Sequence, residues 1–160
     1  MKYLIITLSF LLVSISCSKD VYYKDLIKRE GLYYKKFTDV PFNGNVIGRK
    51  KGNILKGKIE GKWLIYNNSQ IWIKSNYKNG KRHGEWMRYY ASGQLHIKIS
   101  YKEGKTEGEY LFYNQNGTLK KKGNFKFGKK DGEQFEYNKS GQLLKTEIFK
   151  DGKLTAIIEN

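Results

Sequence analysis

A chain of 160 residues with 39% hydrophobic and 29% charged side chains is long and apolar enough for one folded domain, which excludes a disordered protein. Seventeen glycines, a single proline and 15% aromatic residues favour short strands and tight turns over helices, so we expect an all-β fold. The formal charge of +16 suggests a polyanion ligand, but 27 of the 31 basic residues are Lys, whereas specific phosphate recognition usually relies on Arg. An AT-rich genome gives the same excess of Lys, so nucleic acid is not expected as a partner.

The first residues have the order of a secretory signal peptide. A short positive start, Met1 and Lys2, is followed by an apolar run over residues 3–13 and then by small residues up to Ser16. The run is shorter than the roughly 20 residues that a spanning helix needs. We therefore expect residues 1–16 to be the cleaved signal peptide of an exported protein.

Cys17 is the only cysteine of the sequence, so it has no companion for a disulfide or a thiolate metal site. A lone cysteine after a small residue at the end of an apolar run resembles the lipobox of bacterial lipoproteins, although Ser14 stands where that motif usually has Leu. The resemblance implies acylation of Cys17 and a membrane-anchored lipoprotein at the outer membrane or cell surface, with residues 17–30 as a tether. The alternative is an ordinary signal sequence with an incidental cysteine.

Four seven-residue motifs recur after the tether at a nearly constant spacing. Each begins with Gly-Lys and has a second glycine at its fifth position. The motifs are Gly57–Trp63, Gly80–Trp86, Gly104–Tyr110 and Gly128–Gln134, and a fifth start lies at Gly152. This regular recurrence of the first glycine makes the chain a tandem repeat.

A second turn lies inside each unit. It reads Ser92-Gly93, Asn116-Gly117 and Ser140-Gly141, with Asn68-Ser69 in the first full unit. Two turns per unit leave two segments of strand length, so each unit is predicted to be a β-hairpin and the hairpins to form an elongated antiparallel meander sheet. The repeat domain spans residues 31–160, with a degenerate unit at 31–56, full units at 57–79, 80–103, 104–127 and 128–151, and a cap at 152–160.

Alternating apolar residues predict one core face of this sheet, on which Leu64 and Tyr66 of a first strand join Ile73 and Tyr77 of a second. The positions between them are rich in Lys, which predicts a basic, solvated opposite face. The candidate binding residues lie in the non-core phase, and they are Trp63, Trp72, Lys74, Trp86, Arg88, Tyr90, Lys98, Tyr110 and Phe112. Aromatic rings beside cations suit a protein, glycan or lipid partner, unless the sheet curls or a second copy covers them.

The Gly-Lys-x-x-Gly-Glu-Trp/Tyr pattern, followed by a Tyr and an Asn/Ser-Gly turn, resembles the variant MORN-repeat proteins of bacteria. Many of these are known as the antitoxin of a toxin–antitoxin system, of the YwqK type. The resemblance covers about residues 31–153 and implies stacked β-hairpins with an interaction role and no chemistry.

No set of residues points to catalysis, a metal or a cofactor. His83 and His96 are the only histidines, and the positions that match His83 in other units are Glu60, Glu107 and Asp131, so no general base or metal site is indicated. We expect a non-enzymatic envelope lipoprotein whose repeats bind or scaffold a protein partner. The alternatives are an antitoxin or immunity protein that neutralises a toxin, and binding of anionic lipid or polysaccharide through the basic face.

Overall fold

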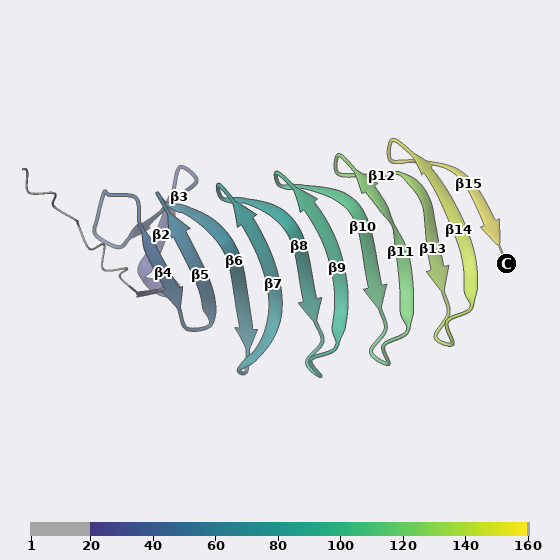
Figure 1. The fold of residues 1–160 in the computed structure, drawn as a ribbon, viewed down its shortest axis with the longest axis horizontal. Coiled ribbons are helices and arrows are strands. Elements are labelled where there is room, and N and C mark those ends of the chain that lie inside the picture. The colour runs from purple at the N-terminus through teal and green to yellow at the C-terminus, as the bar shows by residue number, and fades with distance from the viewer. Residues whose placement is uncertain (1–19, 160) are drawn as a thin grey trace, which may run out of the picture.

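The computed structural model describes residues 20–159, so the predicted signal peptide and Cys17 lie outside the described residues. Almost all of the described chain belongs to one long sheet of 13 strands (Figure 1). From β4 onward the order of strands in the sheet follows their order in the chain, and neighbours are antiparallel. The predicted all-β meander of hairpins is confirmed.

Four hairpins correspond to the four full repeat units. They are β6 (Lys58–Asn67) with β7 (Gln70–Lys78), β8 (Lys81–Tyr89) with β9 (Leu95–Lys102), β10 (Lys105–Tyr113) with β11 (Leu119–Lys126), and β13 (Gly132–Tyr137) with β14 (Leu143–Lys150). The short β12 (Lys129–Lys130) also pairs with β11. Residues expected to form a cap contribute one more strand, β15 (Lys153–Glu159), at the C-terminal edge.

The N-terminal part differs from the expectation of a tether over residues 17–30. Residues 21–29 form β1 (Val21–Tyr22), the 3-10 helix η1 (Tyr23–Asp25) and β2 (Leu26–Arg29). The degenerate unit is divided, because β3 (Leu32–Lys35) pairs with β2 in a small separate sheet while β4 (Gly44–Ile47) and β5 (Lys50–Leu55) begin the long one. Val21 and Leu26 are only 6% and 9% exposed, and burial of such side chains favours an ordered segment.

Two-residue turns join consecutive hairpins, and their glycines link each unit to the one before. Asn79 and Gly80 have φ angles of 52° and 77°, both positive as a type I′ turn requires. The N–H of Gly80 donates to the carbonyl of Ile59 in the preceding unit at 3.0 Å. The same bond is made by Gly104, Gly128 and Gly152. The repeated Gly-Lys motif is therefore part of the architecture that stacks the units.

A β-bulge lies in the second strand of each hairpin. In the first hairpin Ile65 pairs with Ile73, whereas the next residue, Tyr66, pairs with Ile71, so Trp72 is an extra residue. The corresponding extra residues in the later hairpins are His96, Lys120 and Leu144. Each bulge moves the alternation of the second strand by one position.

The bulges change which side chains share a face. Residues that pair directly across antiparallel strands lie on the same face. Leu64 pairs with Lys74, while Ile65 pairs with Ile73, so Leu64 and Ile73 lie on opposite faces. The prediction of a single core face that holds Leu64, Tyr66, Ile73 and Tyr77 together is therefore wrong.

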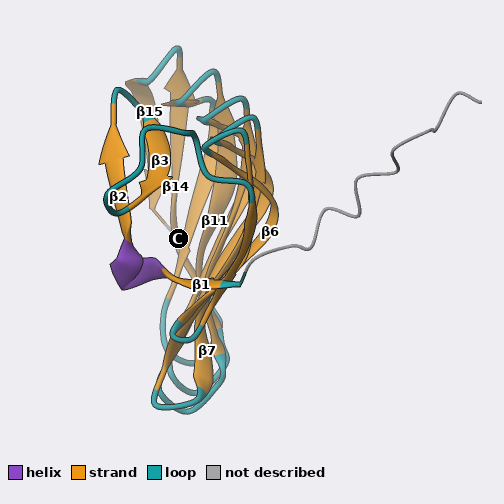
Figure 2. Ribbon diagram, turned by 90° about the vertical axis from the view of Figure 1, so that its left-hand side faces the viewer, coloured by secondary structure: helices purple, strands orange, loops and turns teal. Residues whose placement is uncertain are grey.

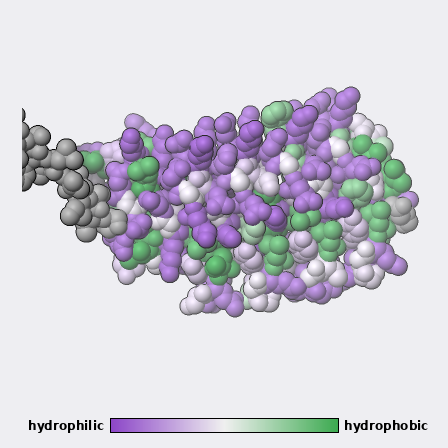
Figure 3. Space-filling view, in the orientation of Figure 1, coloured by the Kyte–Doolittle hydropathy of each residue, from purple (hydrophilic) through white to green (hydrophobic). Residues whose placement is uncertain are grey.

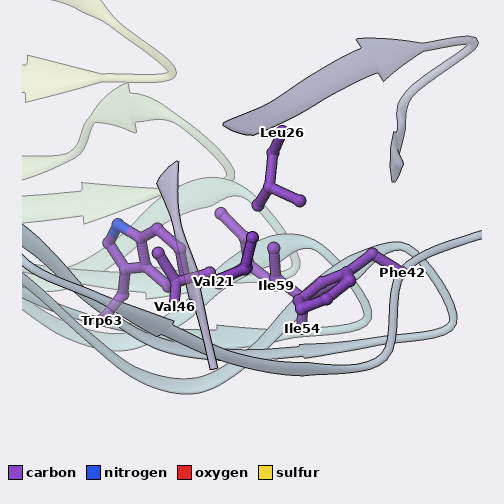
Figure 4. Close-up of a cluster of buried hydrophobic side chains, with 7 residues drawn as sticks. All are labelled: Val21, Leu26, Phe42, Val46, Ile54, Ile59 and Trp63. Atoms are coloured by element: carbon purple, nitrogen blue, oxygen red, sulfur yellow. The ribbon is translucent and has the colours of Figure 1, made fainter. Parts of the chain in front are cut away.

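The largest apolar core lies at the N-terminal end of the sheet (Figure 4). Its buried members are Val21, Leu26, Phe42, Val46, Ile54, Ile59 and Trp63. The rings of Tyr23 and Trp63 meet edge to face, with centroids 6.2 Å apart. Figure 2 shows η1, β2 and β3 on one side of the sheet. The N-terminal segment thus covers one face of the sheet at its first units.

Candidate functional site

The strand register sorts the side chains of the repeat sheet into two faces. On one, which we call the aromatic face, directly paired residues form the row Trp63, Ser75, Trp86, Ile99, Tyr110 and Gly123. On the other, the lysine face, they form the row Leu64, Lys74, Met87, Lys98, Leu111 and Lys122. The N-terminal segment packs on the aromatic face. Figure 3 views the molecule from the lysine face, which is mostly hydrophilic.

The structure brings most of the predicted binding residues together on the aromatic face. They are Trp63, Trp86, Arg88, Tyr90, Tyr110 and Phe112, with Trp72 beside Tyr90 at the bulge. Lys74 and Lys98 do not join them, because they pair with Leu64 and Met87 on the lysine face. Lys98 is held there by Glu85, with Nζ and Oε1 2.6 Å apart. The bulge, which the sequence pattern does not show, separates these lysines from the aromatic rings.

Two of the predicted binding residues belong to the core. Trp63 and Tyr110 are each only 3% exposed. The Tyr110 ring packs against Phe125 and Phe112, with centroid distances of 5.0 Å and 5.3 Å. Burial also raises the pKa of the Tyr110 hydroxyl. Trp63 and Tyr110 are therefore structural residues, and a partner cannot reach them on the folded sheet.

Small residues beside the large rings explain this burial. Trp63 lies between Gly52 and Ser75 in its row, and Tyr110 lies beside Gly123. A Cβ atom at Gly52 would overlap the Trp63 ring and lie 2.9 Å from the Lys62 carbonyl oxygen. Each ring thus lies over a neighbouring strand that has little or no side chain, so a single-layer sheet packs its own aromatic face.

Beyond the N-terminal segment part of the aromatic face is only half-buried, including Trp86 and Ile99. The guanidinium of Arg82 lies 5.6 Å from the Trp86 ring centroid and 5.2 Å from that of Tyr101, and it donates to the Tyr101 hydroxyl at 3.3 Å. Sequence reasoning missed Arg82, which falls within the Gly-Lys motif, and it counted Tyr101 among the core-face positions of a second strand. The feature that places Arg82 on this face is its cross-strand pairing with Tyr77, and this pairing depends on a register shift between the two strands.

Arg88, His96 and Tyr90 form a group at the far end of the same strands. His96 stacks on Tyr90 with centroids 4.1 Å apart, and its Nδ1 accepts a hydrogen bond from Arg88 Nη2 at 3.1 Å. Burial, with the charges of Arg88 and Lys120, lowers the pKa of His96, which favours the neutral ring that can accept this bond. Tyr90, His96 and Phe112 line a hollow of about 490 Å³. This group combines aromatic surface, a cation and a hydrogen-bonding ring.

The C-terminal part of the aromatic face is charged. Lys145 lies between Glu147 and Glu136, with nitrogen–oxygen distances of 2.7 Å and 3.5 Å, and Lys121 is 3.1 Å from Glu136. Burial by itself raises the pKa of Glu136, but the hydrogen bonds and charges of Lys121 and Lys145 outweigh it and lower that pKa. The hydrogen bond from Lys145 likewise lowers the pKa of Glu147. These ion pairs neutralise the lysines at this end.

Among residues 20–159 no group of three or more His, Cys, Asp or Glu side chains is placed to hold a metal ion. No helix in that part of the chain is long and apolar enough to cross a membrane. The geometry that the described residues do provide is an extended, repetitive surface with two chemically different faces.

Tandem β-hairpins stacked in one sheet, with a long uncovered face, define a repeat protein of the hairpin-meander class. Residues 82–103, 106–127 and 130–158 match the model of the MORN repeat variant family. These matches start two residues after the first glycine of the second, third and fourth units, and the first full unit folds as the same hairpin. The three matched units are therefore MORN-type repeats, a class of repeat commonly involved in binding or scaffolding. No curated protein matches the sequence.

Proposed function

We propose that this protein is a non-catalytic scaffold that holds a protein partner on the uncovered part of its aromatic face. The observation that carries the proposal is the difference in exposure between two equivalent tryptophans in the same cross-strand row. Trp63 is 3% exposed beneath the N-terminal segment, whereas the equivalent Trp86 of the next unit is only half-buried. Tryptophan and arginine are the residues most often found at the energetic centres of interfaces, and Arg82 and Arg88 flank Trp86.

The contact between the chain's own N-terminal segment and the first unit supports this reading. The rings of Tyr23 and Trp63 meet edge to face, and the ammonium of Lys50 lies 3.5 Å from the Tyr23 ring centroid. This face thus already binds one segment of the chain through an aromatic side chain that contacts both a ring and a cation. Trp86 with its arginines offers the same chemistry one unit further along. The partner that fits is a protein segment with an exposed aromatic side chain.

Photo-crosslinking at neighbouring residues on opposite faces tests the proposal. A benzophenone amino acid at Ile97 lies on the aromatic face, because Ile97 pairs with Arg88 and Phe112, whereas one at Lys98 lies on the lysine face. We expect irradiation of cells to join one protein to the Ile97 probe and not to the Lys98 probe. Arg88→Glu should reduce the yield of this adduct about tenfold or more, as loss of an interface centre does.

Two results would oppose the proposal. One is an adduct of equal yield from both probes, which would indicate non-specific contact. The other is an adduct at Ile97 that Arg88→Glu leaves unchanged while circular dichroism shows an intact fold. If the captured partner is a toxin that the chain suppresses, the antitoxin role implied by the family resemblance is the particular form of this scaffold function.

We also propose that the scaffold acts at the cell envelope, exported by residues 1–16 and anchored through acylated Cys17. The support is the order of charge, apolar run, small residues and cysteine in the sequence. Cys17→Ser should remove labelling by a radioactive fatty acid and move the protein out of the membrane fraction, whereas Ser18→Ala should change neither. Unchanged labelling of the Cys17→Ser protein would contradict anchoring at this residue.

A further inference from the structure

The turns at one end of the sheet carry pairs of lysines at the same place in every unit. Each two-residue turn is flanked by two lysines that pair directly across it. The pairs are Lys78–Lys81, Lys102–Lys105, Lys126–Lys129 and Lys150–Lys153. All eight side chains are exposed, and we call this set the lysine ladder. It forms the strongly hydrophilic upper edge of the molecule in Figure 3.

The lysine ladder lacks the ion pairs that other lysines of the sheet make. None of the salt bridges found within residues 20–159 includes a ladder lysine. Glu60 and Glu107 lie at two of these turns, where they accept hydrogen bonds from the backbone N–H groups of Asn79 and Phe127, both at 2.7 Å. The other two turns contain Glu103 and Asp151, and none of these four carboxylates takes part in those salt bridges. Like charges placed directly opposite each other destabilise a sheet. A bound polyanion would therefore stabilise the folded sheet by neutralising the repulsion within each lysine pair.

The ladder is a line with a fixed spacing. Successive pairs are two strands apart, and strands in a sheet are about 4.8 Å apart, so the pairs recur roughly every 10 Å. Four pairs in single file match a linear, stiff polyanion whose charges recur along its length. A flat lipid surface would instead need cations spread over a plane.

Most aromatic residues next to the ladder are unavailable to nucleic acid, and the exception among the described residues is Phe127, which is 70% exposed in the turn between Lys126 and Lys129. Tyr101, Phe125 and Phe149 each precede a ladder lysine, but they lie on the aromatic face, on the other side of the sheet from the lysines. Their rings are also engaged, because Arg82 lies over Tyr101, Tyr110 packs on Phe125, and Lys130 lies 4.5 Å from the Phe149 centroid. Binding of single-stranded nucleic acid usually requires a series of free rings on which successive bases stack, and Phe127 by itself does not provide one.

We propose that the lysine ladder binds an acidic polysaccharide, with a carboxylate of the sugar chain at each lysine pair. The site is separate from the aromatic face, so the chain would hold a protein partner on one surface and a polyanionic glycan on another. This places the polyanion-binding role at the turns. Of the more central lysines of the lysine face, Lys98 is already paired with Glu85.

A comparison of two variants with the same net charge tests the proposal, with polygalacturonate as the probe. The ladder variant carries Lys81→Gln, Lys105→Gln, Lys129→Gln and Lys153→Gln. The control removes four exposed lysines outside the ladder, Lys35→Gln, Lys36→Gln, Lys120→Gln and Lys139→Gln. Exposed charge contacts are individually weak, so loss of four of them should make the ladder variant bind about tenfold more weakly than the control. Binding of the unmodified chain should weaken as salt rises.

Several outcomes would overturn the proposal. Equal loss in both variants would mean that net charge alone attracts the probe, and no loss in either would place the binding elsewhere. Tighter binding of single-stranded DNA or of inorganic polyphosphate than of polygalacturonate would contradict a polysaccharide ligand. Photo-crosslinking at Ile97 keeps the two proposals apart, because the ladder variant should leave that protein adduct unchanged.

Discussion

Replacement of Trp63 by Ala is expected to lower the free energy of unfolding by about 3–5 kcal/mol, the range found when a large buried aromatic side chain is removed. Trp63 is 3% exposed, and its ring joins the N-terminal segment to the long sheet through Tyr23 and as a member of the shared core. The loss should therefore release the N-terminal segment together with the first unit. Urea unfolding followed by circular dichroism measures the change.

Trp72→Ala is the matched control for this substitution. Trp72 is 42% exposed at its bulge in the next strand, so the same chemical change should cost much less, on the order of 1 kcal/mol or below. Equal destabilisation by the two variants would show that Trp63 is not the centre of the core. Hydrogen exchange should also show faster exchange of the backbone amides of Val21 and Leu26 in the Trp63→Ala protein.

The second large effect is expected at Gly52. A methyl group there would overlap the Trp63 ring and crowd the Lys62 carbonyl oxygen, so Gly52→Ala should cost about 1–3 kcal/mol, as overpacking does. The cost depends on the ring. In the Trp63→Ala background the methyl group meets only the Lys62 carbonyl oxygen, so Gly52→Ala should cost clearly less than it does beside Trp63. Urea midpoints of the two single variants and the double variant give this coupling.

Gly141→Ala separates a packing effect from a backbone effect. Gly141 has φ of 88°, and nothing lies within 4 Å of the Cβ position, so its substitution strains the backbone without any steric contact. Its cost should be the same whether residue 63 is Trp or Ala. A Gly52→Ala cost that is equally independent of residue 63 would contradict the packing of Trp63 over a strand without a side chain.

The fold class followed from local features of the sequence. Turn glycines recur at the same place in every unit, and the positive φ of Gly80 and its equivalents is a property of the turn itself, so hairpin boundaries could be predicted. The assignment of faces could not. It depends on one bulged residue per hairpin, Trp72 in the first, and a bulge arises from the pairing of two strands.

The same distinction applies to the candidate surfaces. Sequence alone identified Trp86, Arg88 and Phe112 as one group, because they share the phase of first strands, which the bulges leave unchanged. It placed Lys74 and Lys98 with them wrongly, because those residues follow the bulge.

The sequence by itself determined that this chain is a stack of β-hairpins, since spacing, glycine turns and alternation are encoded within each single unit. Only the tertiary structure decided which of the aromatic rings are core and which are free. Trp63 and Trp86 occupy equivalent positions, but residues 21–35 fold back over Trp63, which also lies beside Gly52, whereas Trp86 lies beside Ile99 and stays half-buried. That cover is a contact between segments far apart in the chain, which no repeat pattern specifies.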